Sequence, residues 1–481
     1  MITLSISIIV LVVGYWIYGK IIERVFGIKP ERATPAHTKA DGVDFVKLPA
    51  WKIFLIQFLN IAGLGPIFGA VAGALWGPVA FLWIVLGSLF AGGVHDYFSG
   101  MMSIRHGGES ISEVSGFYLG NWIRQFMRGF TVILMIMVGA VFLIGPAKIL
   151  AGMTDGLGLG AWVGIILVYY ILSTILPIDK VIGRFYPVFG FALLFMAFGL
   201  LIAMFTQNLP VPELTFSSFS NLHYRSESFP VFPMLFVTIA CGAISGFHST
   251  QSPIMARCMG NERQGRGIFY GAMITEGVVA LIWAAISMSF FGGVRELNVE
   301  MLGNGDNAAL VVNEISNGAL GTIGGFLAIL GVVAAPITSG DTSFRSARII
   351  IADFMKSSQK SVRNRLLISI PLFVVGYLLT LVNFGVIWRY FAWTNQTLAT
   401  VVLWTVTVYL IKNAKFYWIA LIPAVFMTSV VVSYILLAPE GFSFPVNISI
   451  FIGVGVALIL GVFVTVWPTR TEWVADPPMV K

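Results

Sequence analysis

The 481-residue chain has unusually few charged residues. Only 11% of its residues are Asp, Glu, Lys or Arg, whereas soluble globular domains average about 25%. Because so little charge cannot cover a water-facing surface, the composition excludes an ordinary soluble protein. The hydrophobic content of 57% and the mean hydropathy of +0.89 indicate a surface that faces a lipid bilayer.

Cysteine is also scarce, with only two residues in the chain. Cys241 and Cys258 are 17 positions apart in an apolar stretch, about 25 Å along a helix, which is too far for a disulfide. No Cys and His spacing typical of zinc and no Gly-rich phosphate loop is present. We therefore expect no cofactor, and active transport would draw on an ion gradient. Basic loops on one side of a membrane explain the net charge of +7 better than nucleic-acid binding does.

Long apolar runs dominate the rest of the sequence, and about 20 residues suffice for a spanning helix. Thirteen such runs predict an all-α integral membrane protein. They cover residues 2–22, 51–75, 79–103, 128–152, 160–177, 185–206, 229–257, 266–292, 318–344, 365–383, 388–411, 416–438 and 446–467.

The distribution of basic residues predicts the orientation of these helices. With the N-terminus outside and the C-terminus cytoplasmic, 25 of the 29 Lys and Arg residues fall in inner segments and three in outer ones. Such a bias is the positive-inside rule. The first run carries its charges, Lys20 and Arg24, after the apolar stretch, which is the reverse of a secretory signal. We therefore expect a retained helix in a bacterial inner membrane.

Two of the predicted helices contain sequence that disfavours a continuous helix. The second contains Asn60-Ile61-Ala62-Gly63-Leu64-Gly65-Pro66 near mid-span, where proline lacks a backbone donor and glycine adds freedom. A packed proline kink would also fit this stretch. The seventh contains the polar run Ser245-Gly246-Phe247-His248-Ser249-Thr250-Gln251-Ser252-Pro253. In hydrocarbon such a run lines a cavity or makes hydrogen bonds between helices.

These two helices stand five spans apart, which predicts two inverted repeats that each open with a broken helix. Paired broken helices of this kind indicate a midplane binding site. The predicted divisions are an extra N-terminal helix (1–23), a cytoplasmic linker (24–50), a first repeat (51–206), a second repeat (229–411) and two C-terminal helices with a tail (412–481). The residues expected to bind substrate are Gly63, Leu64, Gly65, Pro66, Gly246, His248, Ser249, Thr250, Gln251 and Ser252.

Further polar residues lie in the ninth and third runs. Thr338 and Ser339 offer hydroxyl oxygens that suit a hard cation such as sodium, or they bond back to their own helix. Asp341 has the i,i+4 spacing to pair with Arg345, which would neutralise it.

His95 and Asp96 are suited to relaying protons or to anchoring a packed helix. Lys148 either meets a substrate carboxylate or extends to the headgroups.

Four motifs resemble the carbon starvation protein CstA family. They are Asp41-Gly42-Val43-Asp44-Phe45-Val46, Ala62-Gly63-Leu64-Gly65-Pro66, Ser245 to Arg257 and Ile337 to Arg345. The resemblance covers most of the chain. It implies an importer that is induced under carbon starvation and associated with peptide or pyruvate uptake.

The resemblance also implies the LeuT-type fold, in agreement with the five-plus-five pattern. By that resemblance, the carbonyls of Leu59 and Ala62 would bind a sodium ion together with Thr338 and Ser339. Pro66 replaces the asparagine of a second sodium site, so one coupling cation is expected. We favour sodium, with protons carried by His95 and Asp96 or by His248 as the alternative.

The sequence therefore predicts an ion-coupled symporter for short peptides or small carboxylates such as pyruvate. A substrate-gated channel and a membrane enzyme are the alternatives. The interrupted repeats argue against a channel, and no third catalytic partner for His248 and Ser249 is evident from spacing. Oligomeric state does not follow from the sequence.

Overall fold

The apolar runs fold into helices because a helix satisfies its backbone hydrogen bonds within its own segment, as lipid requires. The computed structural model describes residues 1–42, 44–154, 156–175, 178–359, 361–382 and 384–466. Within these residues the regular secondary structure is entirely helical, without a β-strand. The predicted all-α class is confirmed.

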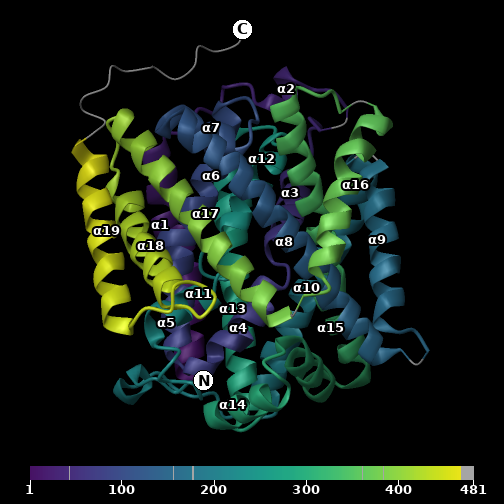
Figure 1. Cartoon of the computed structure of the whole chain (residues 1–481), viewed down its shortest axis with the longest axis vertical. Helices are drawn as coiled ribbons and strands as arrows, with labels where there is room; N and C mark the ends of the chain where they lie inside the picture. The colour runs from purple at the N-terminus through teal and green to yellow at the C-terminus, as the bar shows by residue number, and fades with distance from the viewer. Residues whose placement is uncertain (43, 155, 176–177, 360, 383, 467–481) are drawn as a thin grey trace.

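The body of the molecule is a bundle of roughly parallel and antiparallel helices (Figure 1). Its helices are α1 (Ile2–Phe26), α3 (Ala50–Ile61), α4 (Gly65–Gly73), α5 (Val79–Leu86), α6 (Gly93–Arg105), α8 (Asn121–Met153), α9 (Leu159–Ile175), α10 (Ile178–Thr206), α11 (Phe236–Thr238), α12 (Gly246–Ala256), α13 (Gly271–Phe290), α15 (Ala308–Met355), α16 (Val362–Leu379), α17 (Phe384–Lys412), α18 (Trp418–Leu437) and α19 (Val446–Val466). Three short helices are α2 (Pro35–Thr38), α7 (Ile111–Leu119) and α14 (Val294–Gly303).

Nine helices among the described residues are long and apolar enough to cross a membrane. The pair α3 and α4, which bends by 46°, makes a tenth span if it counts as one. The predicted runs 229–257 and 318–344 correspond to α11 with α12 and to part of α15. Gly321 interrupts α15 with a φ of +64°, close to the predicted start at 318. The count of thirteen and the repeat boundaries stay predictions.

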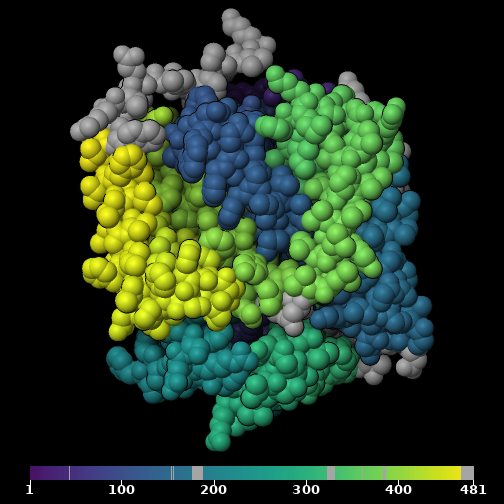
Figure 2. All heavy atoms as spheres, viewed as in Figure 1, coloured from purple at the N-terminus to yellow at the C-terminus, as the bar shows by residue number. Residues whose placement is uncertain are grey.

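The two ends of the bundle differ in what covers them. Met1 and α14 lie at one end, called here the α14 end, and α2 and α7 lie at the other, the α2 end (Figure 1). In the space-filling view, the segments around α14 form a layer across the α14 end (Figure 2). The predicted orientation would place this end outside the cell.

Packing within the bundle brings the predicted broken helices together. α15 packs along α8, while α12 packs on α6 and α3, and α13 packs on α4. α18 and α19 pack on each other at the edge of the bundle opposite α9 and α16 (Figure 1). The centre of the molecule therefore consists of α3, α4, α6, α12 and α13 on one side and α8 and α15 on the other.

Candidate functional site at two broken helices

The first break separates α3 from α4 at residues 62–64. Pro66 lies in the first turn of α4, where its missing N–H costs nothing because no carbonyl precedes it in the helix. At the end of α3, the Ser339 hydroxyl from α15 contacts the carbonyl oxygens of Leu59 and Asn60, each at 3.2 Å. The structure thus brings Ser339 to Leu59, as the cation-site prediction requires. It places the Asn60 carbonyl, rather than that of Ala62, beside the hydroxyl.

The second break lies at residues 239–245, between α11 and α12. The prediction that the helix opens within residues 246–253 is wrong, because α12 begins at Gly246 and runs through this stretch. Gly242 ends the preceding segment with a φ of +90°, a conformation that favours glycine. Ser249 and Thr250 donate to the carbonyls of Gly246 and Phe247, so they fit a helix despite their polarity.

Neighbouring side chains donate to two carbonyls of this second break and to one carbonyl of α11 before it. The Trp83 indole donates to Ile239, Ser88 donates to Gly242, and Gln396 of α17 donates to Phe236, over 2.8 to 3.3 Å. Backbone groups at membrane depth need such partners because no water is available in hydrocarbon.

Asn395 of α17 caps the first turn of α12. Its Oδ1 accepts from the Phe247 N–H at 2.6 Å, and its Nδ2 donates to the Ser245 hydroxyl at 2.8 Å. Asn395 is not among the site residues predicted from the sequence. Its signal was the polar run Thr394-Asn395-Gln396-Thr397 inside an otherwise apolar span.

Three buried amides near the first break have polar atoms without a hydrogen-bond partner among the described residues. Asn60 is fully buried at the end of α3 with neither amide atom bonded. Gln57 on α3 and Gln251 on α12 each leave their Oε1 unbonded. Since a buried polar atom without a partner costs about 1–3 kcal/mol, these atoms are suited to a bound solute.

A chain of four titratable side chains joins α6, α12 and α13, and all four are fully buried. Asp96 of α6 accepts from two imidazoles, with Nδ1 of His95 at 2.7 Å and Nδ1 of His248 at 2.9 Å. On the other side of the ring, Nε2 of His248 lies 3.4 Å from Oε2 of Glu276 on α13. The predicted neighbours His95 and Asp96 thus join the predicted site residue His248.

Glu276 is not among the site residues predicted from the sequence. It is the only charged residue between Arg266 and Arg295, which was the available signal. Cys241, His248 and Glu276 place one ligand-type atom each within 4.8 Å of one another. Three such atoms are one fewer than a closed structural zinc site uses, and the spacing fits a hydrogen-bonded proton site equally well.

The other predicted charges are divided between two places. Asp341 accepts from the Ser173 hydroxyl of α9 at 2.5 Å, and Arg345 donates to the Ser173 carbonyl at 2.9 Å. Asp341 and Arg345 are both buried and thus meet at one serine. Lys148 is half-buried on α8.

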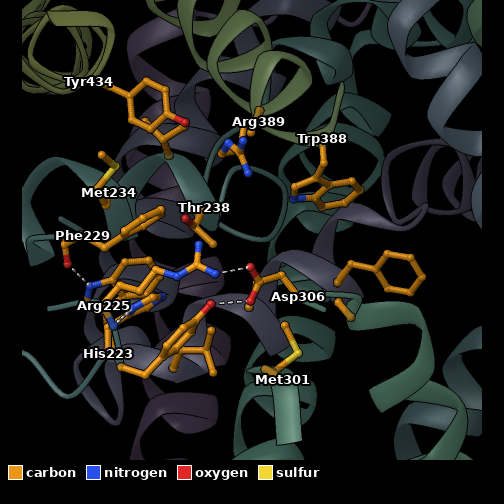
Figure 3. Close-up of a pocket in the computed structure, with 18 residues that line it drawn as sticks. His223, Arg225, Phe229, Met234, Thr238, Met301, Asp306, Trp388, Arg389 and Tyr434 are labelled. Atoms are coloured by element: carbon orange, nitrogen blue, oxygen red, sulfur yellow. Dashed lines mark hydrogen bonds and ion pairs between the residues drawn. The ribbon is translucent and has the colours of Figure 1, made fainter. Parts of the chain in front are cut away.

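A cavity of about 110 Å³ lies at the α14 end, next to α4 and α11 (Figure 3). Arg225 pairs with Asp306 at 3.0 Å across its mouth, and the Tyr224 hydroxyl also donates to Asp306. Arg389 of α17 faces the cavity and pairs with Glu440 at 3.2 Å. Aromatic side chains and two ion-paired guanidinium groups therefore line this vestibule.

A larger cavity of about 860 Å³ opens at the α2 end. Arg257, Ser110 and Ile349 line it and also line a small adjoining space of about 20 Å³ that reaches Thr250 of α12. The predicted site residues on α12 thus lie between a vestibule at one end and a wide opening at the other.

Comparison with known proteins identifies the family. The model of the carbon starvation protein CstA family matches residues 1–157, 156–318 and 292–434. The chain belongs to this family. A peptide transporter CstA of Campylobacter jejuni is 24% identical over 88% of this chain and 78% of its own length.

Two further relatives differ in identity and in how much of their own length aligns. An uncharacterized membrane protein of Haemophilus influenzae is 44% identical over 60% of this chain and 91% of its own length. The pyruvate/proton symporter BtsT of Escherichia coli is 27% identical over 57% of this chain and 47% of its own length.

Two solved structures share the fold at 14% identity. A Na⁺-coupled sialic acid symporter aligns over 97% of this chain and 99% of its own, with a TM-score of 0.53. MhsT in complex with L-phenylalanine aligns over 87% and 99%, with a TM-score of 0.56. The LeuT-type fold is confirmed. This CstA protein is a multi-pass membrane transporter and not an enzyme.

Proposed function

We propose that the protein is an ion-coupled symporter that takes up short peptides or small carboxylates such as pyruvate across the bacterial inner membrane. The observation that carries this proposal is Asn60, which is fully buried at an interrupted helix with both amide atoms unbonded. Its Nδ2 suits a substrate carboxylate and its Oδ1 suits a substrate amide or ammonium group.

The substrate path of this proposal runs between the two halves of the centre. Gln251 of α12 donates to Ser346 of α15 at 3.4 Å, and Thr250 contacts Met135 of α8. These polar contacts join α12 to the α8 and α15 pair. A rocking motion of α12 relative to α8 and α15 would therefore break few hydrogen bonds at this interface. Alternating access would open this seam first toward the α14 end and then toward the α2 end.

The division into repeats 51–206 and 229–411 and the external N-terminus are part of the same proposal. The paired breaks before α4 and α12 support the repeats, and the basic residues near the α2 end support the orientation. Cysteine placed at Ser226 should react with an impermeant maleimide from outside, and cysteine at Ser358 only after permeabilisation. The reverse pattern would refute the orientation.

The coupling ion is Na⁺ or H⁺, and each has a structural candidate. Ser339 against the Leu59 and Asn60 carbonyls resembles an oxygen-rich sodium site. The chain of His95, Asp96, His248 and Glu276 is suited to protons. Uptake into proteoliposomes under separately imposed sodium and pH gradients distinguishes them.

The test of the transport function uses substrate exchange, which needs no gradient. Proteoliposomes loaded with pyruvate or dialanine should accumulate the labelled compound by counterflow. Asn60→Ala should raise the KM of exchange by about tenfold, the effect of losing roughly 1.4 kcal/mol. The matched control is Asn317→Ala, because Asn317 is exposed on α15. If Asn60→Ala leaves the KM of exchange unchanged, the proposed substrate site is contradicted. Substrate flux without counterflow would indicate a channel.

A further inference from the structure

Four titratable groups from three helices meet at the second break, in a cluster made of His95, Asp96, His248 and Glu276. Each side chain has no exposed surface. The contacts form one chain. Asp96 lies 2.7 Å from His95 and 2.9 Å from His248, and His248 lies 3.4 Å from Glu276. α6 and α13, which supply the two carboxyl groups, belong to the spans Val79–Arg105 and Glu262–Phe290 that follow the two broken helices.

The charge of this cluster depends on how many protons it holds. No Lys or Arg among the described residues forms an ion pair with it, and its polar neighbours include the Cys241 thiol and the backbone of Gly242. With both carboxylates ionised and both imidazoles neutral, the cluster carries two negative charges. An uncompensated buried charge is costly, so the occluded cluster is neutral only with two added protons.

The contact between His248 and Glu276 is the weaker end of the line. Asp96 receives two short charge-assisted bonds, whereas neither oxygen of Glu276 makes a hydrogen bond of good geometry. Loss of a proton there leaves a carboxylate facing an imidazole in an apolar site. Such a state is favoured only when water reaches the cluster.

We infer that Glu276 and His248, oriented by Asp96 and His95, form the site that binds the coupling proton. The inference rests on the proposed symport function and selects its ion. On one side of the membrane, the Glu276 carboxylate takes a proton from water and forms an O–H bond. On the other side, that bond breaks and returns the proton to water, so the cycle needs no further reactant.

The position of His248 explains how proton binding would reach the substrate path. His248 lies in the first turn of α12, three residues before Gln251, which faces α15. Cys241, which lies beside His248 and Glu276, packs against Gly65 at the start of α4. A charge that appears at His248 or Glu276 therefore acts on both half-helices at once.

The first experiment compares coupled and uncoupled transport in proteoliposomes that contain pyranine. For wild type, we expect pyruvate or dialanine uptake to acidify the lumen and a pH gradient to drive accumulation. Glu276→Gln should lose pH-driven accumulation by about tenfold or more while counterflow stays within about twofold. Glu276→Asp should keep coupling with a shifted pH profile. Thr275→Ala, a change at the neighbouring position of α13, is the control.

The outcomes separate this inference from the proposed function. Accumulation driven only by sodium, or a Glu276→Gln variant that still couples to the pH gradient, overturns the proton site and leaves the transporter intact. Absence of counterflow for every substrate defeats the proposed function instead.

A substrate-free measurement covers variants that fold poorly. pH-difference infrared spectra of wild type should contain a protonated-carboxyl band that Glu276→Gln removes. No such band, or stoichiometric zinc binding that Glu276→Gln abolishes, also overturns the proton site.

Discussion

Gly65, the first residue of α4, lies directly against Cys241 in the second break. A Cβ added to Gly65 would lie 2.2 Å from the Cβ and 2.3 Å from the Sγ of Cys241. On the other side of this contact, the Cβ position of Gly242 is 3.6 Å from the Pro66 Cα. The two breaks are therefore in contact with each other, and α4 has no space there for a side chain.

This contact predicts that Gly65→Ala impairs both stability and transport. The added methyl group overpacks the junction, which costs about 1–3 kcal/mol. A lower melting temperature and slower counterflow are expected. Gly129→Ala on α8 is the matched control, because nothing lies within 4 Å of that Cβ position. Cys241→Gly should partly restore Gly65→Ala, whereas Cys241→Ala keeps the clashing Cβ and should not.

The cap of α12 gives a second prediction. Asn395→Ala removes the acceptor of the Phe247 N–H, now 2.6 Å from Oδ1, and should cost about 0.5–2 kcal/mol. Asn395→Asp keeps that acceptor but buries a carboxyl group and removes the Nδ2 donor to Ser245, so it should also lower stability. Thermal unfolding of the purified protein measures both. Thr397→Ala is the control because its hydroxyl donates back to the Trp393 carbonyl of its own helix. Equal melting temperatures for Asn395→Ala and wild type would contradict the capping role.

The sequence predicted the first break well and the second only approximately. At the first break, the residues that disfavour a helix, Gly63 to Pro66, coincide with the interruption itself. Local backbone preferences were therefore enough to predict its position. At the second break, Gly242 interrupts the helix, whereas the more conspicuous polar run after Ser245 is helical. Polarity indicated function there, but hydroxyl groups that bond back to helix carbonyls do not open a helix.

The partners of the site were beyond what the sequence alone predicts. His95 and Asp96 are neighbours in the chain, but Glu276 reaches them only through His248, and Asn395 is 150 positions from Ser245. Such pairs depend on how α6, α12, α13 and α17 pack. A lone polar residue in an apolar span shows that a partner exists without naming it.

Ser339 provides a third prediction, which bears on the sodium alternative. Ser339→Ala leaves the carbonyls of Leu59 and Asn60 without this donor and should lower stability by about 1–3 kcal/mol. Under the proton assignment, the drop in melting temperature should be the same in sodium and potassium chloride. Ser343→Ala, whose hydroxyl bonds back to Gly340, is the control. Sodium-specific stabilisation that disappears in Ser339→Ala would establish a sodium site and contradict the proton assignment.

The vestibule at the α14 end gives a pH-dependent prediction through His223. Its ring stacks on Phe229, with the centroids 5.1 Å apart, and is tilted by 43° against Trp76, whose centroid is 4.4 Å away. Burial and the nearby Arg225 lower the pKa of His223 from 6.5 to about 4. The folded vestibule therefore holds the neutral ring, and its stabilisation is fully present above pH 6.5.

Between pH 6.5 and about 4 the open form binds a proton that the closed form does not. The stability of the closed vestibule therefore decreases as the pH is lowered through this range. Each pKa unit corresponds to about 1.36 kcal/mol before solvent screening. Hydrogen exchange of residues 221–230, corrected for intrinsic rates, should show more opening at pH 5 than at pH 7.5. Arg225→Gln should make the increase in opening at pH 5 smaller, because removing one cause of the low pKa brings the folded-state pKa of His223 closer to 6.5. His223→Gln should remove the pH dependence, and the same profile in that variant would assign it to another group.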